Sequence, residues 1–166
     1  STIALIGVLT LAGTIVRALV ARQSIFADEL STYWISATHG IGGVLSLMYG
    51  IGAIRHAEIT PPVSFVLSWL TTRAGHSPEL LRLPELVAGI LTVPAVYALG
   101  QRVADRRTAV VAAALTTLSP FMIYYSAEAR AYGLMMLGLI VSTLAVLRAI
   151  ETRRAGWWVL YAAAAW

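Results

Sequence analysis

The sequence predicts an all-α protein, a polytopic bundle of transmembrane helices, because it is apolar, poorly charged and divided into long apolar runs. Of its 166 residues, 58% are hydrophobic and 12% are charged, and the mean hydropathy is +0.77. Ordinary soluble domains carry about 25% charged residues. There is too little polar side-chain surface here to cover a water-soluble globule, so lipid must cover much of the protein.

Four apolar runs are long enough to cross a membrane, and a fifth begins near the end of the sequence. A transmembrane helix needs about 20 residues, with a range of about 17 to 25. The runs cover residues 2–20, 83–100, 109–125, 131–147 and, incompletely, 157–166. A signal peptide is the alternative for the first run, but no basic segment precedes it and no small-residue cleavage site follows it. These runs predict a multi-pass membrane protein.

The arginines predict the orientation of the spans. Three arginines lie within 101–107 and three within 148–154. Short arginine-rich loops stay in the cytoplasm according to the positive-inside rule, so the long segment 21–82 lies outside. Arg17 and Arg22 oppose this orientation from the outer end of the first run. Snorkelling of their side chains would accommodate them.

Charge and cysteine content exclude other classes of protein. The net charge is +4, but the arginines are scattered between apolar runs instead of forming one polar face, which argues against nucleic-acid binding. The sequence contains no Cys, which excludes a disulfide framework and a thiolate metal site.

The predicted outer segment contains three short helical patterns, around residues 30–37, 44–54 and 60–73. In the third, Thr60 is a candidate N-cap before two prolines, and the apolar stretch is only about 18 Å long. We expect helices that lie along the outer membrane surface with Trp34 and Trp69 at headgroup depth. The alternative is that the third segment is a tilted or buried span, which would invert the topology after it.

The second span has its own start signal. Ser77-Pro78-Glu79 combines a hydroxyl cap, a proline at the first helical position and an acid near the positive end of the helix dipole. Pro94, farther along, predicts a kink.

The predicted topology places several ionisable residues on the outer side of the membrane, at a similar depth. They are Asp28, Glu29, His56, Glu58, Arg82, Glu85, Glu128 and Arg130. Carboxylates can remove a proton from a hydroxyl group, and guanidinium groups can bind a phosphate in bidentate fashion. Together with a lipid-facing cleft, these groups are typical of sugar transfer from a polyprenyl phosphate.

Each element also has a structural interpretation. Asp28 and Glu29 can cap a helix, since acids favour its N-terminal end. Arg82 and Glu85 can form an i,i+3 surface ion pair, and residues 128–130 can be an ordinary polar turn. No cluster has convincing metal-ligand spacing; a divalent cation held by Asp28 and Glu58 would be the only candidate.

Four motifs occur in an order that resembles a known family. Asp28-Glu29 follows the first run, Pro61-Pro62 opens an apolar helix, and Leu-Arg-Leu-Pro follows at 81–84. The run SPFMIYYSAEARAY at 119–132 is the most specific of them. Together they resemble the GT-C membrane glycosyltransferases, and within them the bacterial branch of the protein O-mannosyltransferase and aminoarabinose transferase family.

The resemblance implies an inverting single displacement and a polyprenyl-phosphate sugar donor. It maps Asp28 onto the general base, with Glu29 beside it. It also maps Arg82, Glu128 and Arg130 onto the binding site for the carrier phosphate.

The resemblance also implies that the acceptor and the sugar are bound by His56, Glu58 and Tyr125. The family commonly has His immediately before Pro-Pro, whereas this sequence has Thr60 there and its histidine at position 56. The resemblance further implies the bacterial cytoplasmic membrane, an active site facing outside, and a protein, lipid or glycan acceptor. Family members are longer, so we expect this chain to be an N-terminal fragment.

Two other function classes are compatible with these residues. A non-catalytic membrane module could bind a lipid-linked glycan, or scaffold a cell-envelope complex, through the same arginines. A transporter is less favoured, because no span centre carries a charge and no inverted repeat is visible.

Overall fold

The computed structural model describes residues 1–48 and 61–165, and this part of the chain contains helices and no strands. The predicted all-α helix bundle is therefore confirmed. The helices are α1 (Thr2–Val20), α2 (Ala27–Thr38), α3 (Ile41–Met48), α4 (Pro62–Thr72), α5 (Pro78–Val103), α6 (Arg106–Leu118), α7 (Pro120–Ser126), α8 (Tyr132–Thr152) and α9 (Ala155–Ala164).

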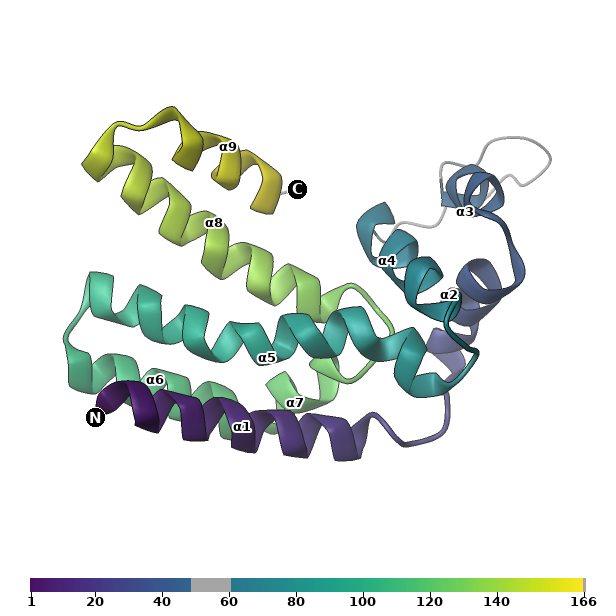
Figure 1. Ribbon diagram of the computed structural model, residues 1–166, viewed down its shortest axis with the longest axis horizontal. Coiled ribbons are helices and arrows are strands. Elements are labelled where there is room, and N and C mark those ends of the chain that lie inside the picture. The colour runs from purple at the N-terminus through teal and green to yellow at the C-terminus, as the bar shows by residue number, and fades with distance from the viewer. Residues whose placement is uncertain (49–60, 166) are drawn as a thin grey trace.

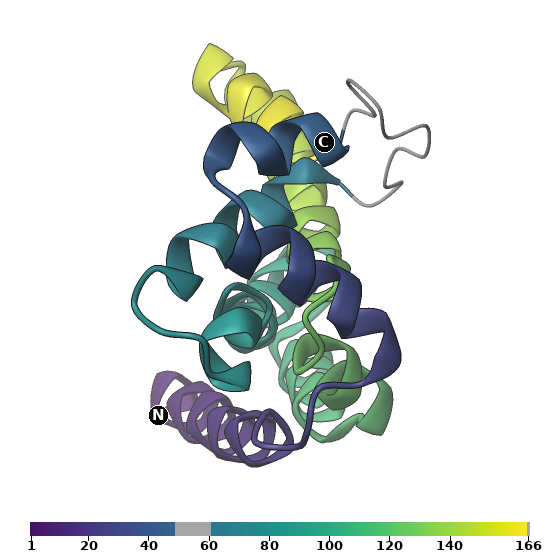
Figure 2. The same ribbon diagram turned by 90° about the vertical axis from the view of Figure 1, so that its right-hand side faces the viewer.

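The long helices run alongside one another, and α5 lies at the centre of the bundle (Figure 1). It packs against α1, α4, α6, α7 and α8. Helices α2, α3 and α4 gather at one end of the bundle, and the α5–α6 and α8–α9 connections lie at the other (Figures 1 and 2). The described helices of the segment predicted to lie outside therefore occupy one end, and the two arginine-rich connections occupy the opposite end.

Three described helices, α1, α5 and α8, are long and apolar enough to cross a membrane. Helices α6 and α7 meet this test only together, and they are bent by 59° at Ser119. The span predicted for 109–125 therefore consists of two helices with a bend between them. The reason is local: Pro120 disfavours helical backbone in the residue before it, and the Ser119 hydroxyl caps α7 by accepting from the Met122 N–H at 3.4 Å.

Helix α5 begins as its sequence predicts. The Ser77 hydroxyl accepts from the Leu80 N–H at 3.3 Å, Pro78 is the first helical residue and Glu79 lies in the first turn. The helix continues through Pro84 and Pro94.

Helices α2, α3 and α4 share a hydrophobic cluster, which consists of Ile35, Val44, Leu47, Met48 and Phe65. Helix α4 has only 11 residues and is too short for a span. Its N-cap is Pro61, which makes no side-chain capping hydrogen bond, and Thr60 lies outside the described residues. The three helices therefore form a small layer of their own at one end of the bundle.

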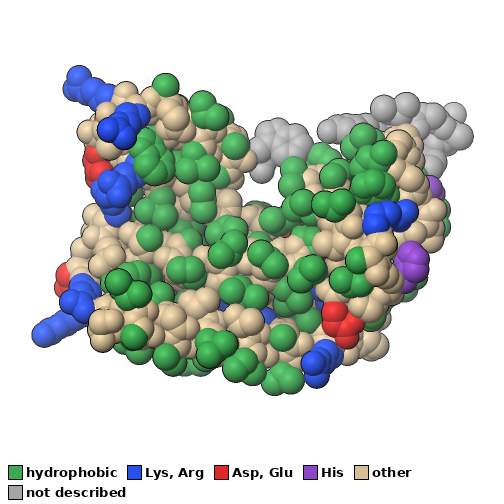
Figure 3. Space-filling view, viewed as in Figure 1, with side chains coloured by type: hydrophobic (Ala, Val, Ile, Leu, Met, Phe, Trp, Pro, Cys, Tyr) green, Lys and Arg blue, Asp and Glu red, His purple; other side chains and the backbone are tan. Residues whose placement is uncertain are grey.

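The face seen in Figure 3 is largely covered with hydrophobic side chains, and arginines gather at the end that carries the α5–α6 and α8–α9 connections. Exposed apolar residues continue along the long helices, for example Val8, Leu115 and Leu139, each more than 60% exposed. This surface suits contact with lipid.

Candidate functional site

Four chain segments meet at the end of the bundle below α2 and enclose a cavity of about 150 Å³. They are the loop after α1, the first turn of α2, the second turn of α5 and the turn after α7. The charged residues of the cavity lining are Glu29, Arg82 and Glu128. We call this region (residues 21–29, 78–85 and 124–131) the acid–arginine end.

Glu29 and Arg82 form a buried, bidentate ion pair. Arg82 Nε donates to Glu29 Oε1 at 2.7 Å, and Arg82 Nη2 donates to Glu29 Oε2. The two side chains are 1% and 4% exposed. Paired hydrogen bonds of this kind fix orientation as well as charge, so α2 and α5 are joined in one geometry.

The remaining donors of Arg82 hold the loop after α1. Nη1 donates to the carbonyls of Ala21 and Gln23, both at 2.6 Å, and Nη2 donates to the Ser24 carbonyl at 3.1 Å. An arginine has five N–H donors, and each donor of Arg82 thus has an acceptor within the protein. This geometry argues against the direct phosphate contact expected for Arg82.

Glu29 also anchors the turn after α7. Its Oε1 accepts from the Ala129 N–H at 2.7 Å, and its Oε2 accepts from the Phe26 N–H at 3.0 Å, as in a capping box. Burial disfavours the charged form, but the bonds from Arg82, Phe26 and Ala129 together hold the pKa of Glu29 below its usual value. The capping interpretation is therefore correct for Glu29, which in addition connects three segments.

Asp28, the neighbouring acid, has a different environment. It lies in the first turn of α2 and is exposed. Its backbone carbonyl accepts from the Ser31 hydroxyl at 3.0 Å. The acid proposed as general base is therefore accessible, whereas the acid beside it is buried.

Glu128 and Arg130 lie in the turn after α7, next to α2. Glu128 is 8% exposed. Burial raises its pKa, and the negative charges of Glu29 and Asp28 raise it further, against the opposing effect of Arg130 and Arg82. Arg130 Nη1 donates to Ser31 Oγ at 3.4 Å. The Glu-Ala-Arg turn and the Asp-Glu pair, 100 residues apart in sequence, thus meet at one place.

Arg82 and Glu85 do not form the ion pair that their spacing suggested. Glu85 is fully buried and accepts from the Ser64 hydroxyl at 2.7 Å and from the Leu134 N–H at 2.9 Å. It therefore connects α4, α5 and α8. Gly133 permits this approach, because a Cβ there would lie 2.6 Å from the Glu85 carbonyl oxygen.

Arg17 does not snorkel to the surface, as the sequence suggested, but is 1% exposed in the interior. Its Nε donates to Ser126 Oγ at 2.8 Å, and its Nη2 donates to the Thr116 carbonyl at 3.2 Å. Gly89 makes room for this contact, since a Cβ there would lie 2.1 Å from the Ser126 Cβ. Arg17 therefore joins α1 to both α6 and α7.

Tyr125 belongs to an aromatic cluster, with ring-centroid distances of 4.5 Å to Phe121 and 4.8 Å to Tyr132. The neighbouring Tyr124 lines the cavity. His56 and Glu58 lie outside the described residues. In the described ranges, no three His, Asp or Glu side chains are grouped so that they could hold a metal ion, and the suggested cation between Asp28 and Glu58 involves a residue outside those ranges.

Two residues that hold buried charged side chains in place were not predicted from the sequence. Ser64 binds Glu85, and Ser126 binds Arg17. A signal exists for the first, because Ser64, Ser68 and Thr72 recur every four residues along one face of α4 and all three are buried. Ser126 lies within the recognised 119–132 motif, but nothing in its spacing indicates an arginine in the first apolar run.

The fold and this end of the bundle together define a class: a membrane-spanning, all-helical protein with a buried acid–arginine network under an exposed carboxylate. A family model described as dolichyl-phosphate-mannose-protein mannosyltransferase matches residues 59–166, which is more than half of the chain. The chain therefore belongs to this family, whose members are glycosyltransferases of the GT-C type. No curated protein and no solved structure matches it.

Family membership confirms the resemblance found in the sequence and implies, in general terms, a lipid-linked sugar donor and a membrane-associated acceptor. Arg82, Glu128 and Arg130 lie within the matched residues, whereas Asp28 and Glu29 precede them.

Proposed function

We propose that this protein transfers a sugar from a polyprenyl-phosphate donor to an acceptor hydroxyl at the outer face of the bacterial cytoplasmic membrane, with inversion at the anomeric carbon. The observation that carries the proposal is the acid–arginine end itself: an exposed Asp28 next to a Glu29 that is locked to Arg82 and Ala129. Membership in a GT-C glycosyltransferase family supports the reaction class.

In the proposed step, the Asp28 carboxylate removes the proton of the acceptor hydroxyl while the acceptor oxygen attacks the anomeric carbon. The bond between that carbon and the phosphate oxygen breaks, and its electron pair leaves with the lipid phosphate. Because attack and departure occur on opposite faces of the sugar, one displacement inverts the configuration. A general base of this kind contributes about 10²- to 10⁴-fold to the rate.

Arg130 is the proposed contact for the departing phosphate. It projects from the turn after α7 toward α2, where its Nη1 reaches Ser31. A guanidinium group at this place would stabilise the negative charge that grows on the phosphate oxygens as the sugar leaves.

Glu128 is proposed to lie beside the same phosphate, because it lines the cavity together with Glu29 and Arg82. Burial raises the pKa of Glu128, and the charges of Glu29 and Asp28 raise it further. A raised pKa lowers the cost of placing this carboxyl group near a phosphate.

Arg82 and Glu29 are proposed as positioning residues. All five donors of Arg82 are used on Glu29 and on the loop after α1, which holds the segment leading to Asp28 in place. His56, Glu58 and Tyr125 remain proposed for the acceptor and sugar side, on the family resemblance alone.

The test uses the full protein in membranes. Polyprenyl phosphates carrying radiolabelled mannose, glucose, arabinose or 4-aminoarabinose are added to membranes that contain the protein and to matched membranes that lack it. Protein-dependent appearance of label in an acceptor, with the anomeric configuration opposite to that of the donor, supports the proposal. Retention of configuration contradicts the single displacement, and donor binding without any product favours the non-catalytic binding module.

A further inference from the structure

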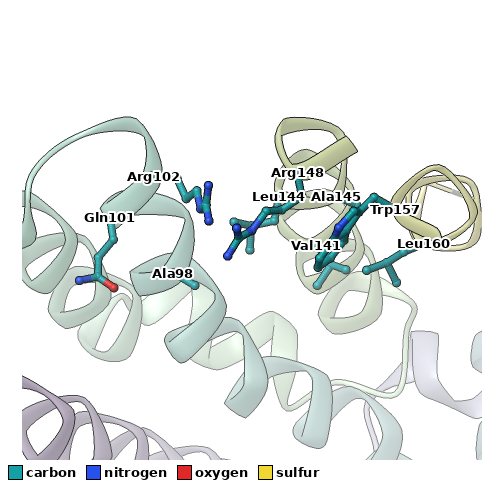
Figure 4. Close-up of a pocket in the computed structure, with 9 residues that line it drawn as sticks. All are labelled: Ala98, Gln101, Arg102, Val141, Leu144, Ala145, Arg148, Trp157 and Leu160. Atoms are coloured by element: carbon teal, nitrogen blue, oxygen red, sulfur yellow. The ribbon is translucent and has the colours of Figure 1, made fainter. Parts of the chain in front are cut away.

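A second cavity lies at the opposite end of the bundle, between α5, α8 and α9, with a volume of about 670 Å³ (Figure 4). Gln101, Arg102 and Arg148 supply its polar lining, and Trp157 stands on the α9 side. The other lining residues are aliphatic. The cavity lining therefore combines basic and apolar side chains.

The two arginines come from different long helices. Figure 4 shows the guanidinium group of Arg102, from α5, and that of Arg148, from α8, extending toward one another across the cavity. The Arg148 guanidinium carbon lies 5.9 Å from the centroid of the Trp157 ring, a distance at which a cation and an aromatic face attract. Arg102 Nη1 contacts Glu151.

The surroundings have a strong excess of positive charge. Residues 101–107 and 148–154, which we call the arginine-rich end, contain six arginines and two acids, Asp105 and Glu151. The Arg102–Glu151 pair is partly exposed, with side-chain exposures of 25% and 49%. Ion pairs with this degree of exposure are weak, so Glu151 is a weak competitor for an incoming anion.

The rest of the lining is apolar and suits contact with an acyl chain. Val141, Leu144 and Leu160 line the cavity together with small alanines. A free inorganic phosphate would leave this apolar surface unused, whereas a phospholipid would fill both parts. Basic pockets between transmembrane helices are typical sites for anionic lipid headgroups.

We propose that this cavity binds one anionic phospholipid, with its phosphate between Arg102 and Arg148 and the start of one acyl chain along Val141, Leu144 and Leu160. The site is distinct from the acid–arginine end and does not depend on the proposed transfer reaction. A bound lipid would join α5 to the α8–α9 pair and stabilise that arrangement by binding only the folded state.

The experiment measures lipid retention by native mass spectrometry of the full protein in mild detergent, titrated with phosphatidylglycerol or phosphatidylcholine. The structure predicts one retained phosphatidylglycerol and little retained phosphatidylcholine. In the double variant Arg102→Gln/Arg148→Gln, retention of phosphatidylglycerol should weaken about tenfold or more, because two charge-assisted bonds are lost. Equal retention of both lipids by the wild type would overturn the proposal.

A matched double variant, Arg106→Gln/Arg107→Gln, removes the same charge from the same end but outside the cavity lining, and should change retention less than twofold. An equal loss in both double variants would show general attraction to the surface and would overturn the site.

A third variant is expected to increase lipid retention, a result that misfolding could not produce. Glu151→Gln removes the competing carboxylate and should increase phosphatidylglycerol retention about two- to fivefold, since the Arg102–Glu151 pair is weak. Unchanged or reduced retention would contradict the assignment of Arg102. Millimolar inorganic phosphate should not displace the lipid, and complete displacement would show that the site recognises phosphate alone.

Discussion

The two ends of the bundle treat their charges in opposite ways. At the acid–arginine end, Glu29, Arg82 and Glu85 are almost fully buried and joined by hydrogen bonds to other segments. At the arginine-rich end, Arg102 and Glu151 pair with much of their side chains exposed. A buried charge needs a partner for nearly every donor and acceptor, so the first end is held in one geometry, whereas the second can exchange partners with an incoming ligand.

The same contrast occurs within a single dipeptide. Asp28 and Glu29 are neighbours in α2, but Glu29 is buried and Asp28 is exposed. The helix turns successive side chains by about 100°, so one acid can join the interior network while the other faces outward. A rigid acid thus supports an accessible one.

Breaking the buried pair should have the largest effect on stability. Glu29→Gln leaves the Arg82 charge buried without its carboxylate, which costs about 3–5 kcal/mol of unfolding free energy. The matched change Glu151→Gln, in the exposed pair, should cost about 0–1 kcal/mol. Unfolding of the full protein in detergent measures both. Similar costs for the two variants would show that the ends do not differ as described.

The second prediction concerns the close packing of α5 against α7. Gly89→Ala places a Cβ 2.1 Å from the Ser126 Cβ, so we expect a loss of about 1–3 kcal/mol from overpacking. In Gly7→Ala, at the far end of α1, no atom lies within 4 Å of the new Cβ, and stability should change by less than about 1 kcal/mol. Thermal unfolding of the two variants measures this difference in stability. A Gly89→Ala protein as stable as Gly7→Ala would contradict the close contact of α5 with α7.

The smallest expected effect concerns pH. The folded-state pKa of Glu29 is lowered, so its contribution to stability is present above the unfolded value of about 4.3 and is lost as pH falls through the folded pKa. The wild type should therefore lose more stability on acidification than Glu29→Gln does, in unfolding measured between about pH 6 and pH 3. Parallel curves for the two proteins would contradict the shift.

For Glu128, acidification should change the folding stability in the opposite direction. Its pKa is raised by burial and then by Glu29 and Asp28, so the folded state takes up its proton first as pH falls, and stability gains from that uptake. The variant Glu128→Gln removes this gain. If wild type and Glu128→Gln respond identically between neutral pH and about pH 4, the carboxyl group does not occupy the environment described.

Much of this fold follows from the sequence. Long apolar runs and the Ser77-Pro78-Glu79 start specify α1, α5 and α8 within a few residues, because hydrophobicity and capping are local. The break at Ser119-Pro120 also has a local cause. It was missed because the surrounding run of 109–125 is apolar throughout and was interpreted as one span.

That some of the motif residues lie together was predictable from the sequence, but their contacts were not. The ordered motifs named Glu29, Arg82 and Glu128, which line one cavity. The pairing of Arg82 with Glu29, and not with the nearby Glu85, depends on segments 53 residues apart, and helical spacing cannot reveal such a contact. The burial of Arg17 has the same origin, since its partner Ser126 is 109 residues away.

We propose Asp28 as the base and Glu29 as the residue that holds the framework, and the most direct test is the turnover of Asp28→Asn per folded molecule. Sugar transfer from a polyprenyl-phosphate donor should fall by about 10²- to 10⁴-fold, with the thermal unfolding curve and donor binding close to those of the wild type. Turnover equal to that of the wild type, in a folded Asp28→Asn protein, would contradict the assignment of Asp28 as the base.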